Sequence, residues 1–180
     1  MLILVFLYYI IYQFKKRFPL REKIGFSLDG IRVHNFLASN DSKSTEILNY
    51  MKKDARELPY DQIIESMRAF VDNKRQLLPK IISKLNKITQ TASSQDNPFK
   101  LYSSSLFISY DASIDAEKNS RLKVKLIDFE RVAIPSIEKH LSTQENIKTD
   151  KNDKNDNLIG PDSNILFGLK NLINIFKSFL

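Results

Sequence analysis

The sequence predicts an α+β fold in which antiparallel strands pack against helices. Two stretches of the chain alternate apolar and polar residues, three others repeat apolar residues every three or four positions, and no internal repeat is visible. In chain order the predicted elements are a hairpin, helices, a second hairpin and a terminal helix, which is an α+β arrangement. With 180 residues, 42% of them hydrophobic, the chain is long enough for one domain with a core.

The chain begins with the apolar run MLILVFLYYIIY at positions 1–12. This run is too short to cross a bilayer, which needs about 20 apolar residues. It also lacks the preceding positive charge and the following small-residue cleavage site of a signal peptide. A buried strand, a shallow membrane anchor and a misassigned start of the reading frame stay open for this segment.

The next segment, 24–36, alternates apolar and polar residues around Asp29 and Gly30. Because Asp-Gly between alternating segments favours a hairpin turn, we predict a two-stranded ribbon here. A loop is expected at 39–45 and a short helix at 46–56.

Two helices are expected in the middle of the chain. Asp61 can cap the first, whose apolar residues recur at helical spacing, and the same pattern predicts a second helix over 77–88. Pro79 falls in the first turn of the second helix, where its missing N–H does no harm. The two helices are therefore expected to meet near 73–76.

The last third of the chain supplies the second hairpin. After a linker at 90–98, strands are predicted at 101–110 and 122–129 as an antiparallel pair. The stretch 142–157 mixes charges of both signs with a single apolar residue, so it is expected to be a disordered insertion. An amphipathic helix is predicted over 164–180.

Composition excludes several classes of site. The chain has no cysteine, which excludes disulfides, thiolate zinc sites and cysteine nucleophiles, and two histidines are too few for a histidine-rich metal site. No two of its four glycines have the spacing of a G-x-G-x-x-G or P-loop motif. The net charge of +7 favours polyanionic partners, with a solvated basic face as the alternative. The early basic cluster is too short for a nucleic-acid arm, so no nucleic acid is expected.

The segment LIDF at 126–129 ends a predicted strand with the carboxylate of Asp128. In kinase-type phosphoryl transfer, one such aspartate holds Mg²⁺ between the phosphates of the nucleotide. A hydrophobic strand that ends in Asp is also common as the start of a turn. The tetrapeptide alone leaves both alternatives open.

Three further segments give LIDF a context. SSSLFISYD stands upstream at 103–111, DSNILFGLKNLI stands downstream at 162–173, and FPLREKIGF at 18–26 is followed by GIRV at 30–33. In this order and spacing the segments resemble the inositol polyphosphate kinase family. The C-terminal part of that family contains S-S-L-L-x-x-Y-[DE], then I-D-F, then D-x-x-[YFL]-L-x-G-[LI]-x-x-L-[IV].

The resemblance implies an inositol polyphosphate kinase-like fold, which is SAICAR synthase-like and distantly protein-kinase-like. Residues 15–180 would form its C-lobe, the N-lobe would be absent, and residues 1–14 do not match the family. The resemblance also implies ATP and an inositol polyphosphate as partners and Mg²⁺ with ATP as the cofactor. It further implies a role in inositol phosphate biosynthesis and a location in the cytoplasm, the nucleus or both.

The resemblance assigns roles to four residues. Asp128 matches the metal-binding aspartate of I-D-F, and Ser105 matches a serine whose hydroxyl helps to hold the metal and the nucleotide phosphates. Arg131 stands where the family has a His or Lys facing the phosphorylated substrate, and Arg can pair with a phosphate bidentately. Lys16 stands where a family helix can contact substrate phosphates. The alternatives are a strand hydroxyl satisfied by backbone for Ser105 and a surface charge for Arg131.

One family motif is missing. Members carry P-x-x-x-D-x-K-x-G, whose Asp and Lys contact the nucleotide and the inositol phosphate, and no proline of this chain is followed by it. We therefore predict a truncated kinase with no catalytic residue in this chain, which binds ATP weakly and is inactive or nearly so. The alternative is a non-catalytic remnant that binds polyanions. A membrane protein anchored by residues 1–12 is the least expected alternative.

Overall fold

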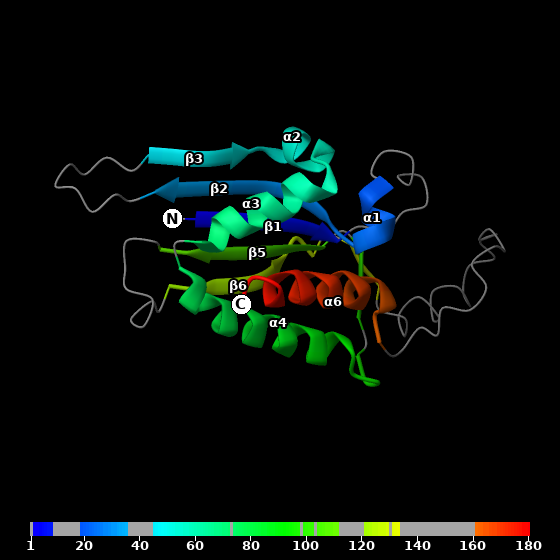
Figure 1. The fold of residues 1–180 in the computed structure, drawn as a ribbon. Coiled ribbons are helices and arrows are strands. Elements are labelled where there is room, and N and C mark those ends of the chain that lie inside the picture. Colours follow the sequence, from blue (N-terminus) through cyan, green and yellow to red (C-terminus); the bar gives the residue numbers. More distant parts are fainter. Residues whose placement is uncertain are drawn as a thin grey trace.

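The computed structural model describes residues 2–8, 19–35, 45–72, 74–97, 99–102, 104–111, 121–129, 131–133 and 161–180. These residues form a five-stranded sheet, with helices α3, α4 and α6 lying in front of it in Figure 1. The arrangement confirms the predicted α+β class with antiparallel strands packed against helices.

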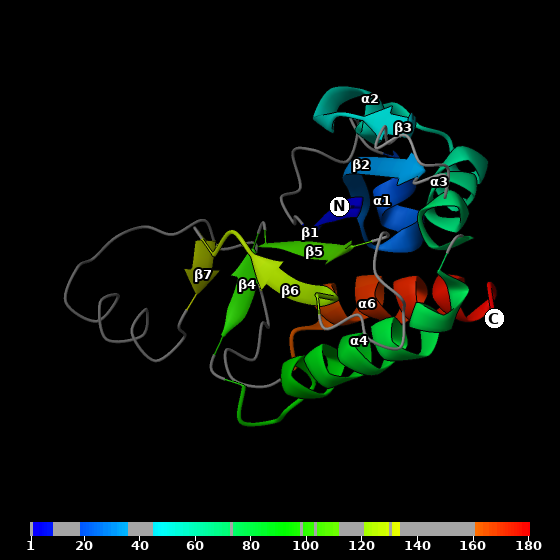
Figure 2. The same cartoon turned by 90° about the vertical axis from the view of Figure 1, so that its left-hand side faces the viewer.

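The five-stranded sheet is antiparallel and has the strand order β3-β2-β1-β5-β6. Its strands are β1 (Leu2–Tyr8), β2 (Ser27–Asn35), β3 (Thr45–Tyr50), β5 (Ser104–Tyr110) and β6 (Lys123–Ile127). A second sheet pairs β4 (Lys100–Tyr102) with β7 (Arg131–Ala133). In Figure 2 this small sheet lies on the left beside β6, and α3 lies on the right.

Six helical segments accompany the strands among the described residues. They are α1 (Pro19–Ile24), α2 (Lys52–Glu57), α3 (Tyr60–Asp72), the short 3₁₀ helix η2 (Arg75–Leu77), α4 (Leu78–Ala92) and α6 (Ser163–Lys177). None of these described helices is both long enough and apolar enough to cross a membrane.

Residues 2–8 of the apolar N-terminal run form strand β1 in the interior of the sheet. β1 pairs with β2 on one side, where Leu4 lies opposite Ile31, and with β5 on the other, where Leu4 lies opposite Ile108. Of the alternatives that the sequence leaves open for this run, the structure shows a strand at residues 2–8, and a misassigned start of the reading frame stays a prediction. β1 therefore joins β2 to β5 within the sheet.

The predicted hairpin at 24–36 is wrong, because this segment forms the single strand β2. Opposite β1, Val5 pairs with Gly30 and Phe6 pairs with Leu28, so Asp29 is an extra residue in a β-bulge. The Asp29 carboxylate accepts a hydrogen bond from Arg56 Nε in α2. Asp-Gly marks a bulge here instead of a turn, and a partner distant in sequence holds the carboxylate.

The helix predicted at 46–56 is correct only in its second half. Residues 45–50 instead form strand β3, in which Leu48 lies opposite Val33 of β2, and α2 begins at Lys52. The pairing with β2 links residues well apart in the chain, which local helix propensity does not report. Apart from its last residue, the loop expected at 39–45 lies outside the described residues.

The predicted helices of the middle and the end of the chain are confirmed. α3, α4 and α6 lie at the expected positions, and Pro79 lies in the first turn of α4. The predicted cap at Asp61 is wrong, because α3 begins at Tyr60 and Asp61 lies inside its first turn. α4 runs on to Ala92, into the expected linker. The strand expected at 101–110 is divided between β4 and β5, which belong to different sheets. The stretch 142–157 lies outside the described residues.

The core lies between the sheet and the helices. Leu106, Ile108 and Tyr110 alternate along β5 and are buried on the face that we call the helix side. The Tyr110 hydroxyl donates to the backbone carbonyl of Phe70 in α3, and the two rings meet edge to face at 5.1 Å. Burial of each such side chain contributes about 1.5–3 kcal/mol.

Candidate functional site

The structure brings the sequence-predicted Ser105 and Asp128 to the same end of two neighbouring strands. Ser105 in β5 lies opposite Ile127 in β6, and Asp128 follows Ile127 directly. On its other side Ser105 lies opposite Leu7 of β1. The serine is therefore central in the sheet, while the aspartate stands where an edge strand ends.

Asp128 has an unusual backbone conformation. Its φ is 61°, and it is the one non-glycine residue with positive φ among the described residues. Asp and Asn are the side chains that adopt this left-handed region most readily, at a cost of about 1–2 kcal/mol for an ordinary L residue. Such outliers cluster at functional sites. Asp128 is also exposed, so it can meet a ligand from solvent.

Ser105 lies on the sheet face opposite the helix side. Along β5 it alternates with the core residues and shares its face with Phe107 and Ser109, which we call the serine side. On β6 the same face carries Ile127 and Lys125, the latter opposite Phe107. Ser105 itself is 1% exposed. The serine side therefore carries two buried hydroxyls and the Lys125 ammonium group on the two strands that lead to Asp128.

Ser104 is a residue that sequence reasoning missed. Its side chain is fully buried, and its Oγ has no hydrogen-bond partner among the described residues. An unsatisfied buried hydroxyl costs about 1–3 kcal/mol. The triple serine of the motif draws attention to this position, but only the three-dimensional contacts separate Ser104 from Ser105.

The structure describes less of the other two residues that the sequence predicts, Arg131 and Lys16. Arg131 begins β7, where it lies opposite Tyr102 of β4, so its backbone belongs to the small sheet and not to the sheet of Ser105. Nothing about its side chain is described. Lys16 lies outside the described residues.

The protein ligands for a metal ion would be few. Within the described ranges, no group of three or more His, Cys, Asp or Glu side chains could hold a metal ion by itself. Mg²⁺ usually binds one or two carboxylates, and waters and nucleotide phosphates complete its octahedron. Asp128 offers one exposed carboxylate of this kind, and Ser105 carries a buried hydroxyl on the neighbouring strand.

Asp162, the first residue of the downstream motif, has a structural role. Its carboxylate is buried at 2% exposure and accepts hydrogen bonds from Leu101 N at 2.8 Å and from Ile165 N at 3.5 Å. The second bond caps the N-terminus of α6. Asp162 therefore joins α6 to β4, and both of its carboxylate oxygens are in use.

Two glycines of the motifs bring the first and the last family segments together. Gly25 has a φ of +78°, and a Cβ on it would lie 2.7 Å from the backbone nitrogen of Gly168 in α6. Beside this contact, Asn171 Nδ2 donates to the Ile24 carbonyl at 3.1 Å. The close approach requires glycine at position 25. These motif residues hold the end of α1 against α6, and Ser105 and Asp128 take no part in that contact.

Comparison with known protein families identifies the family of this chain. A model of the inositol polyphosphate kinase family matches residues 10–177. The chain belongs to the inositol polyphosphate kinase family. The prediction from the four sequence segments is thus confirmed. The match begins within the apolar run, and the domain division after residue 14 stays a prediction.

The fold of this family member is similar to a solved structure. That structure is the inositol phosphate multikinase Ipk2 from S. cerevisiae in complex with ADP and Mn²⁺. The sequence identity is 16% and the TM-score is 0.64, over 99% of this chain and 78% of the yeast chain. At this identity the likeness establishes the fold. No curated protein matches the sequence significantly.

Proposed function

We propose that this chain is an ATP-dependent inositol phosphate kinase that is weakly active or inactive by itself, in which Ser105 and Asp128 hold a Mg²⁺–nucleotide complex. The observation that carries the proposal is the pairing of β5 with β6, which sets Ser105 opposite the residue before Asp128. Membership of the inositol polyphosphate kinase family and a fold similar to an enzyme solved with ADP and Mn²⁺ support it.

Each residue has a defined task in this proposal. The Asp128 carboxylate coordinates the metal, which, when bound, neutralises charge on the nucleotide phosphates. The Ser105 hydroxyl assists at the metal or at a phosphate oxygen. Arg131 and Lys16 pair with phosphates of the inositol substrate, whose negative charge matches the net charge of +7.

We further propose that residues 15–180 form the C-lobe and that residues 1–180 alone transfer phosphate slowly or not at all. The D-x-K-x-G segment of the family is not found in this sequence. Phosphoryl transfer depends on positioning and on charge neutralisation from several groups at once. A carboxylate and a hydroxyl provide only part of both.

The test is Mg-ATP binding to purified residues 1–180 by calorimetry, together with radiolabelled phosphate transfer to an inositol polyphosphate. We expect weak binding to the unaltered chain, at least tenfold weaker binding to Asp128→Asn, and little transfer. Asp96→Asn is the matched control, because Asp96 is exposed in a turn after α4. Equal binding to Asp128→Asn and the unaltered chain would contradict the metal role, and rapid transfer would contradict the C-lobe proposal.

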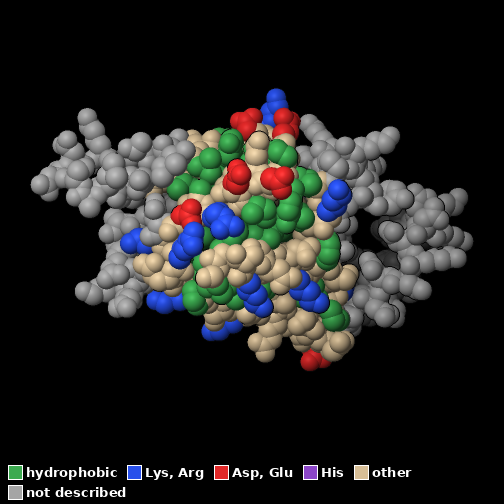
Figure 3. All heavy atoms as spheres, in the orientation of Figure 1, with side chains coloured by type: hydrophobic (Ala, Val, Ile, Leu, Met, Phe, Trp, Pro, Cys, Tyr) green, Lys and Arg blue, Asp and Glu red, His purple; other side chains and the backbone are tan. Residues whose placement is uncertain are grey.

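A second candidate function is polyanion binding without catalysis. α4 and α6 carry five lysines and no acidic residue: Lys80, Lys84, Lys87, Lys170 and Lys177. Lys87 and Lys177 line a shallow groove between the two helices. In Figure 3 basic side chains gather over α4, and acidic ones gather over α2 and α3.

The two candidate functions predict different effects of substitutions on ligand binding. Under the second, the double variant Lys87→Gln with Lys177→Gln weakens binding of inositol hexakisphosphate, and Asp128→Asn leaves it unchanged. Under the first, Asp128→Asn abolishes Mg-ATP binding and the lysine variant retains it. Salt-dependent calorimetry of both ligands with both variants decides between them.

A further inference from the structure

The five-stranded sheet has two edge strands among the described residues, β3 on one side and β6 on the other. β6 pairs with β5 along one side only, so the backbone N–H and C=O groups of its outer edge have no strand partner in the described part of the chain. Such a row of unpaired groups is a template for another extended chain. In this mode of recognition, a segment of one protein adds a strand to the sheet of another.

The serine side of β6 carries two ammonium groups next to this outer edge. Lys123 and Lys125 are both exposed, and they lie opposite Ser109 and Phe107 of β5. Neither lysine has an acidic partner among the residues that the structure describes. Alternate residues of a strand lie about 6.8 Å apart. Acidic residues at every second position of an added strand would therefore match the spacing of the two lysines.

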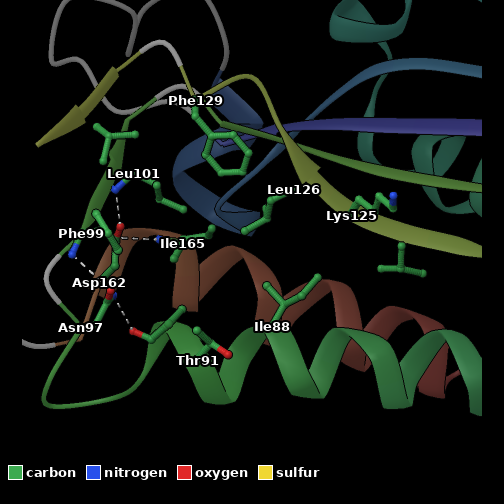
Figure 4. A pocket seen from close by; sticks show the side chains of 13 residues that line it. Ile88, Thr91, Asn97, Phe99, Leu101, Lys125, Leu126, Phe129, Asp162 and Ile165 are labelled. Carbon is green, nitrogen blue, oxygen red and sulfur yellow. Dashed lines mark hydrogen bonds between the residues drawn. The ribbon is translucent and has the colours of Figure 1, made fainter.

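The helix side of β6 is apolar and incompletely covered. Val124 and Leu126 are half-buried, whereas the residues opposite them on β5, Ile108 and Leu106, are fully buried. Figure 4 shows Leu126 on the side of β6 that faces α4, where it lines an apolar pocket. A strand added at the outer edge would set its other side chains beside Val124 and Leu126, so apolar residues fit those positions.

The charges favour an acidic partner over a second copy of this chain. Two antiparallel β6 strands with their serine sides aligned would place lysines opposite lysines, and like charges directly opposite each other destabilise a strand pair. Lysines on an edge strand thus disfavour self-association. β3, the other edge strand, contains Glu46 and no basic residue, so it lacks the charge that would select an acidic segment.

We propose that the outer edge of β6 binds an extended acidic segment of a partner protein as a sixth strand of the sheet. The segment carries Asp or Glu at alternate positions, which pair with Lys123 and Lys125, and apolar residues between them, which lie beside Val124 and Leu126. Backbone hydrogen bonds supply the affinity, and the two lysines supply the preference for acidic sequences. This binding does not depend on the proposed nucleotide site at Asp128.

The test is fluorescence polarisation of a labelled peptide in which Glu and Val alternate, titrated with purified residues 1–180. The double variant Lys123→Gln with Lys125→Gln is expected to weaken binding about fivefold. The matched control is Lys84→Gln with Lys170→Gln, which removes the same charge from exposed positions of α4 and α6 and should bind like the unaltered chain. Equal weakening by the two double variants would overturn the proposal, because the peptide would then respond only to net charge.

A second peptide tests the backbone contacts and needs no variant of the protein. Methylation of alternate backbone nitrogens removes N–H donors from one edge of the peptide and keeps its charge and side chains. We expect this peptide to bind at least tenfold more weakly. Equal binding of the two peptides, or no binding of the unmethylated one, would overturn strand addition. A dimer of the unaltered chain in sedimentation that the peptide does not dissociate would assign the edge to a second copy and would also overturn the proposal.

Discussion

The start of α6 and the end of β6 each carry an aspartate from a family motif, and the two aspartates have opposite surroundings. Asp162 is 2% exposed and both its oxygens accept backbone N–H groups. Asp128 is exposed and sits on a left-handed backbone. The first carboxylate stabilises the fold, and the second is available to a ligand at some cost in backbone strain.

This difference divides the family motifs into two groups. Asp162, Gly25 and Gly168 hold helices against strands, so their substitution should alter stability first. Asp128 follows the last residue of β6, and Ser105 lies near the start of the neighbouring β5. Substitution of Asp128 should therefore alter ligand binding and leave stability nearly unchanged. The following predictions test this division, from the largest expected effect to the smallest.

Asp162→Ala should lower the free energy of unfolding by about 3 kcal/mol. The variant loses the cap of α6, which is typically about 1 kcal/mol, and leaves the buried Leu101 N–H without its charged partner, a further cost of about 2 kcal/mol. Urea denaturation measures the change. Asp96→Ala, at an exposed turn, is the control and should change stability by less than about 0.5 kcal/mol. Equal losses in the two variants would contradict the structural role of Asp162.

Gly25→Ala should cost about 2 kcal/mol or more. A Cβ there would lie under 3.0 Å from the backbone of Gly168, and the positive φ adds strain. Gly30→Ala is the matched control, because its Cβ would meet only the Tyr50 carbonyl at 3.5 Å. If Gly30→Ala were the more damaging of the two in denaturation, the packing of α1 against α6 described above would be incorrect.

Stability should fall at alkaline pH because of Tyr110. Burial, with a smaller contribution from the charge of Asp72, raises the pKa of this phenol. The neutral phenol's contribution is complete below about pH 10, the pKa of an unfolded tyrosine, and is lost above it at up to about 1.4 kcal/mol per pH unit.

The control for the tyrosine prediction is Tyr60→Phe, since Tyr60 is 41% exposed. Unfolding free energies between pH 9 and 11 should decline less steeply for Tyr110→Phe than for the unaltered chain or for Tyr60→Phe. Identical slopes for the three proteins would show that Tyr110 does not titrate differently in the folded state.

Ser104→Ala should raise the free energy of unfolding by about 1 kcal/mol. The substitution removes a fully buried hydroxyl that has no hydrogen-bond partner in the described part of the protein. Ser105→Ala, one residue further, should instead weaken Mg-ATP binding. A stability loss in Ser104→Ala would mean that this hydroxyl has a partner.

Sequence reasoning predicted the parts of the fold that rest on local periodicity. The helical spacing in α3, α4 and α6 and the alternation in β6 are local signals, and the structure follows them. It was wrong at Asp29, where a bulge opposite β1 and a hydrogen bond from Arg56 replace the expected turn. Contacts between distant segments decide such positions, and no local pattern encodes them.

The candidate site was predicted by family resemblance and not by periodicity. LIDF singled out Asp128 and the serine motif singled out Ser105, and the register of β5 with β6 brings them together. The triple serine draws attention to Ser104, but the burial of its hydroxyl without a partner among the described residues depends on contacts in three dimensions. Spacing and charge in the sequence do not report such contacts.

The most direct test of the division between the two aspartates is the stabilisation of each variant by Mg-ATP. A ligand that binds only the folded state raises its stability in proportion to the logarithm of its concentration over its Kd. We predict that millimolar Mg-ATP raises the unfolding midpoint of the unaltered chain and of the less stable Asp162→Asn, but not that of the equally stable Asp128→Asn. A full shift in Asp128→Asn, together with none in Asp162→Asn, would contradict the account.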